Sequence, residues 1–149
     1  MKRYSFLIFI PILLAACGNN KDDEKATGED TALRRYSWEA TDTGTIVLIK
    51  KQGTGPGTLS PEGVVTFLNT NFPQVQLVIV KTSGDTLFLK IPEPTYLTQQ
   101  MGSSGPSVYF AEAVYNLTEI PGIHYVSFDF EEGDHASPAV FNRESINDQ

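Results

Sequence analysis

Cysteine and histidine are scarce in this chain. One cysteine, Cys17, and two histidines, His124 and His135, occur among 149 residues. A single cysteine provides no intramolecular disulfide framework, so a domain in an oxidising compartment must depend on its hydrophobic core. Two histidines without a second cysteine also provide no plausible catalytic triad for a hydrolase. A hydrolase therefore has little support in the sequence. We also expect no cofactor and no resident metal.

Long apolar runs and basic residues are also missing. The apolar run at residues 5–16 is interrupted by Pro11 and is too short to span a bilayer, which takes about 20 apolar residues, and no other run is long enough. Lys and Arg number 11 against 18 Asp and Glu, which gives a net charge of −7. Such a chain repels phosphate backbones and has no basic stripe to overcome that repulsion. Nucleic acid is therefore not an expected partner.

The N-terminus resembles a bacterial lipoprotein signal peptide. A short basic start at residues 1–4 precedes the apolar run, and residues 14–17 (LAAC) fit the lipobox. The two small alanines suit the signal peptidase, and the thiol of Cys17 is the group that accepts lipid. We expect residues 1–16 to be removed as a signal peptide. Cys17 would then carry diacylglyceride and palmitate, in which each buried CH₂ contributes about 0.8 kcal/mol to anchoring.

Residues 17–35 follow as a polar, acidic segment with almost no apolar side chains. This composition predicts a lipid-anchored disordered tether. Removing residues 1–16 takes away two basic residues and no acidic one, so the charge of the mature chain becomes −9. Gly18 rather than Asp after the cysteine favours outer-membrane sorting, and residues 21–24 (KDDE) resemble the export tag of Bacteroidetes surface lipoproteins. We expect an outer-membrane anchor, with the domain either periplasmic or exposed at the cell surface.

Residues 36–149 are expected to form a single α+β domain. Ser60 and Pro61 are typical of a helix start, and Pro106 opens a second, longer helix. β-Branched runs and alternating apolar residues predict the strands. The resulting β-α-β-β-α-β order is typical of a small, mostly antiparallel sheet with two helices packed on one face, as in ferredoxin-like modules. The predicted strands are residues 45–50, 75–81, 85–91 and 125–130.

The second helix has an apolar stripe. Phe110, Val114 and Leu117 recur at helical spacing and are predicted to pack against the sheet. Glu112 falls on the opposite side of the helix. We therefore expect Glu112 to face solvent, and its replacement by alanine to change stability little.

Two loops contain candidate residues for binding a ligand or partner. Residues 92–105 form a small polar loop before a helix start, where free N–H groups can hold an anion. Residues 129–135 contain four carboxylates and a histidine, which are suitable ligands for Ca²⁺ or a transition metal. The first loop lacks the Gly-x-Ser-x-Gly pattern and the second lacks the distal Glu of a calcium loop, so an ordinary loop and a solvated turn are favoured. The candidate residues are Met101, Gly102, Ser103, Ser104, Asp129, Glu131, Asp134 and His135.

Residues 113–123 (AVYNLTEIPGI), with the strand that follows, resemble the end of the GerMN domain of sporulation and germination proteins. That family has a helix, a TLTE- or TLTQ-type segment, a Pro-Gly turn and a strand in this order, and a hairpin comparable to residues 78–91. The similarity covers roughly residues 59–133. The chain departs from the pattern at Asn116, in residues 92–105 and after the last strand. The resemblance implies a non-catalytic module similar to the ring-building domains of envelope assemblies, with no catalytic residue.

Together these features predict a membrane-anchored envelope lipoprotein whose single domain is a protein-interaction or scaffold module. Its partners would be the lipid bilayer, through lipidated Cys17, and an unidentified envelope protein or glycan. The alternative is a surface module that binds a glycan or a metal through residues 92–105 and 129–135.

Overall fold

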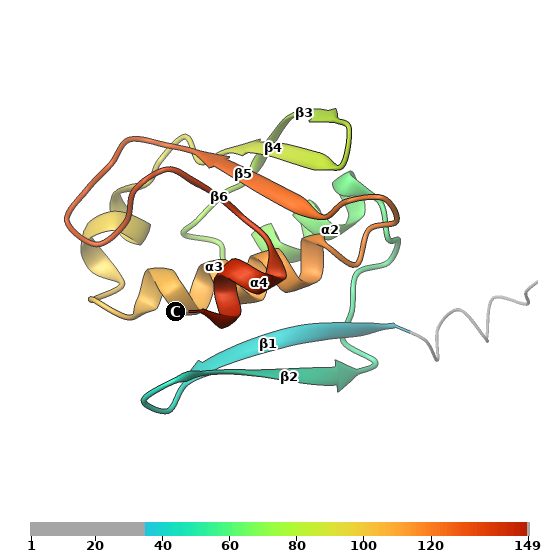
Figure 1. The fold of residues 1–149 in the computed structure, drawn as a ribbon, viewed down its shortest axis with the longest axis horizontal. Coiled ribbons are helices and arrows are strands. Elements are labelled where there is room, and N and C mark those ends of the chain that lie inside the picture. Colours follow the sequence, from blue (N-terminus) through green and yellow to red (C-terminus); the bar gives the residue numbers. More distant parts are fainter. Residues whose placement is uncertain (1–34, 149) are drawn as a thin grey trace, which may run out of the picture.

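Two β-sheets lie on either side of the helices (Figure 1). The computed structural model describes residues 35–148. The π-helical turn is labelled η1, and the remaining labels follow Figure 1. The elements in chain order are β1 (Tyr36–Asp42), β2 (Ile46–Gln52), α2 (Pro61–Asn71), β3 (Val78–Ser83), β4 (Thr86–Lys90), η1 (Tyr96–Gln100), α3 (Gly105–Leu117), β5 (Tyr125–Asp129), β6 (Ala139–Phe141) and α4 (Arg143–Asn147).

The larger sheet has the strand order β3-β4-β5-β6, and the smaller one is a hairpin of β1 and β2. Strands β4 and β5 run parallel, whereas the other neighbours run antiparallel. Helices α2 and α3 lie on the same side of the four-stranded sheet, and the β1–β2 hairpin lies beyond them (Figure 1). The predicted α+β class, with a small and mostly antiparallel sheet, is confirmed.

The order of elements differs from the predicted β-α-β-β-α-β. The first predicted strand corresponds to β2, but it pairs with β1 and does not join the larger sheet. The sequence does not predict β1, β6 or α4. Strand β1 (YSWEATD) mixes polar and acidic residues with its aromatics, while β6 has three residues and α4 has five. Such short or polar segments give a weak local signal.

The predicted start of α2 is confirmed. The Ser60 hydroxyl accepts a hydrogen bond from Gly63 N at 3.1 Å, and a proline occupies the first turn. This cap satisfies one of the free N–H groups at the helix start. The predicted hairpin is present as β3 and β4, with Gly84 at φ +60° in its tight turn, although β3 begins at Val78 and not at residue 75.

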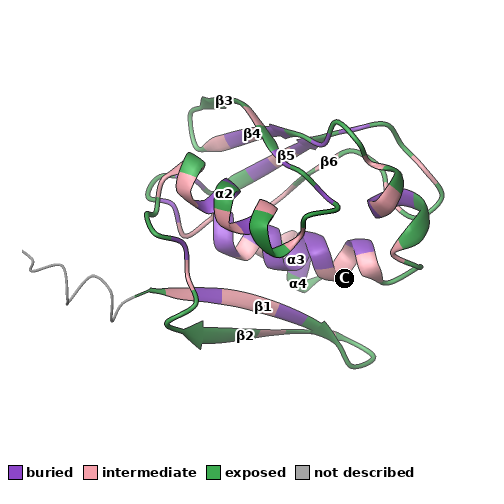
Figure 2. Ribbon diagram, turned by 180° about the vertical axis from the view of Figure 1, so that it is seen from behind, coloured by how far each residue is buried: buried purple, intermediate pink, exposed green. Residues whose placement is uncertain are grey.

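The predicted apolar stripe of α3 faces the core between this helix and the four-stranded sheet. Phe110 stacks on Phe130 and Phe141, at centroid separations of 6.1 and 5.0 Å. Val114 and Leu117 are fully buried. Figure 2 shows α3 as a nearly continuous buried helix between the two sheets.

The predicted exposure of Glu112 is wrong. This residue is only 8% exposed, and its Oε2 accepts a hydrogen bond from Ala40 N at 3.0 Å. The β1–β2 hairpin covers the side of α3 that would otherwise face solvent. Burial raises the pKa of Glu112, although the bond from Ala40 opposes the shift. Because protonation thereby favours the folded state, the contribution of Glu112 to stability decreases as the pH rises from its ordinary pKa toward the raised one.

Asn116 and Glu119 extend the contact between α3 and β1. Asn116 Oδ1 accepts from Trp38 N at 3.0 Å, and its Nδ2 donates to Trp38 O at 2.8 Å. Glu119 accepts from Tyr36 Oη, from Trp38 Nε1 and from Arg143 Nη2. Burial would raise the pKa of Glu119, but these hydrogen bonds and the positive charge of Arg143 lower it. Helix side chains thus take the place of a neighbouring strand along the outer edge of β1.

Candidate functional site

The face of the four-stranded sheet that points away from the helices is uncovered. Alternation along β4 and β5 turns residues such as Leu87 and Phe128 into the core, so the residues between them face outward. Phe88 lies in one outward-facing row with Ser127 and Val140, because these residues are cross-strand partners. We call this surface the open face, and its members are Val78, Phe88, Lys90, Tyr125, Ser127, Asp129 and Val140.

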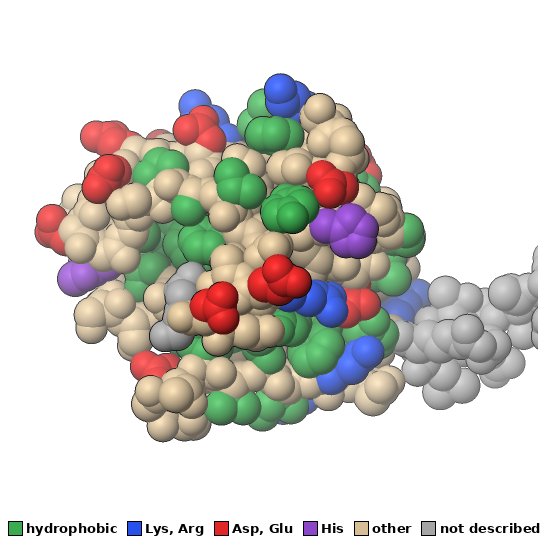
Figure 3. Space-filling model, in the orientation of Figure 1, with side chains coloured by type: hydrophobic (Ala, Val, Ile, Leu, Met, Phe, Trp, Pro, Cys, Tyr) green, Lys and Arg blue, Asp and Glu red, His purple; other side chains and the backbone are tan. Residues whose placement is uncertain are grey.

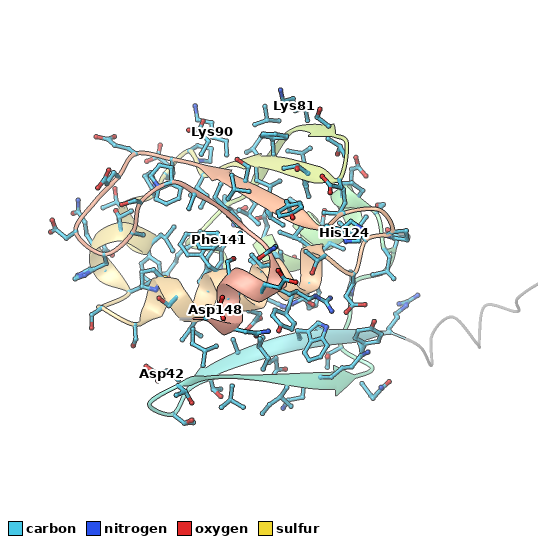
Figure 4. The ribbon with its side chains drawn as sticks, in the orientation of Figure 1. Asp42, Lys81, Lys90, His124, Phe141 and Asp148 are labelled. Atoms are coloured by element: carbon cyan, nitrogen blue, oxygen red, sulfur yellow. The ribbon has the colours of Figure 1, made fainter. Side chains whose placement is uncertain are left out.

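Several apolar residues of the open face are strongly exposed. Val78 is 49% exposed, Tyr125 40% and Val140 57%. Lys81 and Lys90 project on the side away from the helices (Figure 4), and Lys81 Nζ lies 4.8 Å from the centroid of the Phe88 ring. The open face therefore mixes exposed apolar residues with charged ones, and two of the charged residues, Lys90 and Asp129, are partners on its central strands. Protein interfaces also combine apolar and charged residues.

A cleft of about 500 Å³ adjoins one end of the open face. Strands β5 and β6 separate beyond the pair of Val126 and Phe141, where β6 ends and the chain turns into α4. His124 marks this end of the molecule in Figure 4, and acidic and basic side chains gather beside it in Figure 3. The cleft is lined by Asp85, Thr118, His124, Tyr125, Asn142, Arg143 and Glu144.

Arg143 is held firmly at the wall of the cleft. Its Nε donates to Thr118 Oγ1 at 2.8 Å, and its Nη2 donates to Tyr115 O at 3.0 Å and to Glu119 Oε1 at 2.6 Å. The guanidinium carbon also lies 4.8 Å from the centroid of the Tyr115 ring. Because Glu119 balances the charge of Arg143, the cleft is a place for polar, hydrogen-bonding groups rather than a strong anion site.

The two loops predicted from the sequence lie together, at the end of the molecule opposite the cleft (Figure 1). His135 N donates to Thr98 O at 3.0 Å. A Cβ built on Gly133 would lie 2.6 Å from Thr98 Cβ, so the close approach of the loops requires a glycine there. Met101 and Gly102 end η1, with Gly102 at φ +75°. Met101 is half-buried, while Gly102, Ser103 and Ser104 are exposed.

The acidic loop does not form a recognisable metal centre. Asp129, Glu131, Asp134 and His135 are all exposed. Within residues 35–148 there is no group of three or more His, Cys, Asp or Glu side chains that could hold a metal ion. The backbone carbonyl of Asp129 accepts from Ile91 N at 2.9 Å, so this residue also extends the sheet. Binding of a glycan by these loops stays a prediction.

The cleft was not predicted from the sequence. Its lining comes from the β3–β4 turn, the end of α3, the start of β5 and the start of α4. No short stretch of sequence contains more than three of these residues, so local spacing carries no signal for it. The open face could be recognised in part from the sequence, because residues 125–130 alternate between apolar and polar side chains, as in a strand with one outward side.

Comparisons of this chain with protein-family models, with curated proteins and with solved structures found no match. Within the part of the chain that the structure describes, no helix is long and apolar enough to cross a membrane. The predicted signal peptide, Cys17 and nearly all of the predicted acidic tether lie outside the described residues. The resemblance to the GerMN family therefore stays a prediction, and the functional argument rests on the residues of this chain.

Proposed function

We propose that this protein is a lipoprotein of the cell envelope, anchored through Cys17, whose domain is a non-catalytic module that binds another envelope protein. The open face carries this proposal. Val78, Tyr125 and Val140 expose apolar side chains on one sheet face, and no helix or strand within residues 35–148 covers it. Burying such a surface against a partner is favourable, and clustered exposed apolar residues mark interaction sites.

The cleft and the GerMN resemblance support the same role. Tyr125 belongs to the open face and also lines the cleft, so a partner seated on the sheet would reach the polar groups of the cleft. An apolar contact next to fixed hydrogen-bonding groups such as Arg143 provides both affinity and orientation. The resemblance of residues 59–133 to GerMN domains implies an assembly module of the same general kind.

A photocrosslinking experiment tests the open face. We expect benzoylphenylalanine in place of Tyr125, in the full chain in intact cells, to form a discrete adduct with another envelope protein. Adding Val140→Lys to that chain should remove most of the adduct, because it replaces an exposed apolar side chain of this surface, on the edge strand β6, with a charge. The matched control is Leu59→Lys, which changes an exposed leucine outside the open face and should leave the adduct unchanged. An adduct that survives Val140→Lys would contradict the proposed surface.

Substitution of the lipidation residue tests the anchor. We expect Cys17→Ala to abolish incorporation of radiolabelled palmitate and to leave an uncleaved precursor, because the thiol is the lipid acceptor. Electrophoresis and autoradiography of whole cells measure both effects. Palmitate labelling equal to that of the unmodified chain would show that the protein is not a lipoprotein anchored at this residue.

A further inference from the structure

The hydrogen-bond pattern of the β1–β2 hairpin shows which backbone groups of β2 point outward. Gly53 N donates to Arg35 O at 2.6 Å, and hydrogen-bonded pairs alternate with non-bonded ones in an antiparallel ladder. The odd-numbered residues of β2 therefore bond to β1. The even-numbered residues direct their N–H and C=O groups to the opposite edge, and these are Ile46, Leu48, Lys50 and Gln52.

These outward groups form an open strand edge. Within residues 35–148 none of them has a hydrogen-bond partner. Figure 2 shows β2 largely exposed at the margin of the molecule, with no element beyond it. The corresponding edge of β1 is closed, because side chains of α3 bond to its outward N–H and C=O groups. The hairpin therefore has one free edge, and it belongs to β2.

The other strand edges are less suited to pairing. Strand β3 contains a register shift between Ile79 and Lys81, and β6 has only three residues. Bulges and short strands are devices that keep sheet edges from pairing with other chains. Strand β2 has seven residues in regular register and contains neither proline nor glycine. It is the longest regular edge in the described part of the chain.

We propose that β2 pairs antiparallel with β2 of a second copy of this chain, about a two-fold axis at Leu48. The two hairpins would then form one continuous four-stranded sheet. Leu48 supplies outward backbone groups, so it can form a hydrogen-bonded pair with Leu48 of the partner subunit. In this register Val47 lies opposite Ile49 of the partner subunit. These two side chains are 39% and 45% exposed in the monomer, and the pairing brings them together.

The charges of β2 favour this antiparallel arrangement. Lys50 and Lys51 lie at one end of the strand, so a parallel partner would bring lysines against lysines. The two-fold arrangement instead places Lys50 opposite Ile46 of the partner subunit. Asp42 pairs with Ile46 within each hairpin, and it has no ion pair within residues 35–148. Two strand spacings, roughly 10 Å, separate Lys50 from that carboxylate. In the monomer Lys50 Nζ lies 3.4 Å from the centroid of the Tyr36 ring, so its side chain must turn away from that ring to form the ion pair.

The proposed contact between the two copies buries little surface, so it depends on the copies being held close together. One strand per copy buries much less than the roughly 800 Å² per partner of a standard interface. Weak pairing becomes effective when copies are confined together, because confinement raises their effective concentration. The test therefore uses the full chain in intact cells.

Disulfide formation between two differently tagged copies measures this register. One copy carries Val47→Cys and the other carries Ile49→Cys, and both side chains are exposed, so neither substitution disturbs the core. Directly opposite residues in a non-hydrogen-bonded pair have Cα atoms about 4.5 Å apart, which suits a disulfide. Two copies of the Ile49→Cys chain would place their cysteines diagonally, about 7–8 Å apart, which is too far. We expect the mixed pair to crosslink at least fivefold more than either variant alone.

Two further variants complete the experiment. Leu48→Lys on both copies should reduce the mixed crosslink at least fivefold, whereas Val140→Lys, on the open face, should leave it unchanged. Equal crosslinking of the mixed and the single variants would overturn the proposed register. If the mixed pair crosslinks no more than two copies of a Val140→Cys chain, the dimer itself is overturned. Neither result bears on the open-face adduct, so failure of this proposal is distinguishable from failure of the proposed function.

Discussion

The Leu117→Ala variant should lose about 2–5 kcal/mol of unfolding free energy. Leu117 is fully buried at the end of α3, on the side that packs against the four-stranded sheet. Removing its methyl and methylene groups leaves a cavity that the surrounding helix and strands can close only in part. A domain of this size is typically stable by about 5–15 kcal/mol, so the loss should be plain in a urea unfolding curve.

Leu59→Ala is the matched control, because it makes the same change at a leucine that is 49% exposed. Its effect should remain within about 0.5 kcal/mol. Comparable midpoints for the two variants would mean that α3 does not pack in the orientation described, and the core would have to be reassigned.

The Asn116→Ala variant should lose about 2–4 kcal/mol, although it removes no apolar contact of the core. Asn116 is 2% exposed and bonds to both backbone groups of Trp38, as well as to the carbonyl of Glu112. Its truncation leaves an N–H and a C=O group of β1 without partners. Trp38 is the only tryptophan of the chain, so its fluorescence reports on the β1–β2 hairpin.

We expect Trp38 emission in Asn116→Ala to change at lower urea concentration than in the unmodified chain. Asn71→Ala serves as the control, since Asn71 is exposed at the end of α2. Its midpoint should stay within about 0.5 kcal/mol of the unmodified chain. If Asn116→Ala behaves like this control, the helix side chains do not hold β1 in the way that their hydrogen bonds indicate.

Local signals in the sequence were sufficient for the central elements. Ser60 and Pro61 mark the start of α2, and the strands predicted at residues 75–81 and 85–91 correspond to the β3–β4 hairpin. The apolar stripe of α3 correctly identifies the side that faces the larger sheet. Each of these features depends on residues within a few positions of one another, and such features can be recognised without tertiary information.

The second buried side of α3 could not be recognised in this way. Glu112 and Asn116 are typical solvent-facing residues, and they become buried only because Ala40 and Trp38, more than 70 positions earlier, supply backbone groups to bond. Strand β1 in turn has little strand signal of its own. Two segments that each resemble surface sequence therefore form an interface, and neither pattern indicates it alone.

The candidate site, too, could be predicted only in part from the sequence. The sequence predicted two ligand loops from local clusters of polar residues, and the structure does bring these loops together at Thr98 and His135. The cleft beside the open face depends on Arg143, which reaches the end of α3 from a short helix that the sequence does not predict. Only the folded chain brings its lining together.

The attachment of β1 to α3 has a mechanical consequence. The chain enters the described structure at β1, so a pull transmitted from the preceding residues loads Tyr36 and Trp38 first. Both residues bond to Glu119, which also pairs with Arg143 near the opposite end of the chain. When the pull runs along the strand, the hydrogen bonds of β1 to β2 and to α3 are loaded in shear and must break together. The hydrogen bonds of β1 to β2 and to α3 therefore make the domain resistant to a pull applied from its N-terminal side.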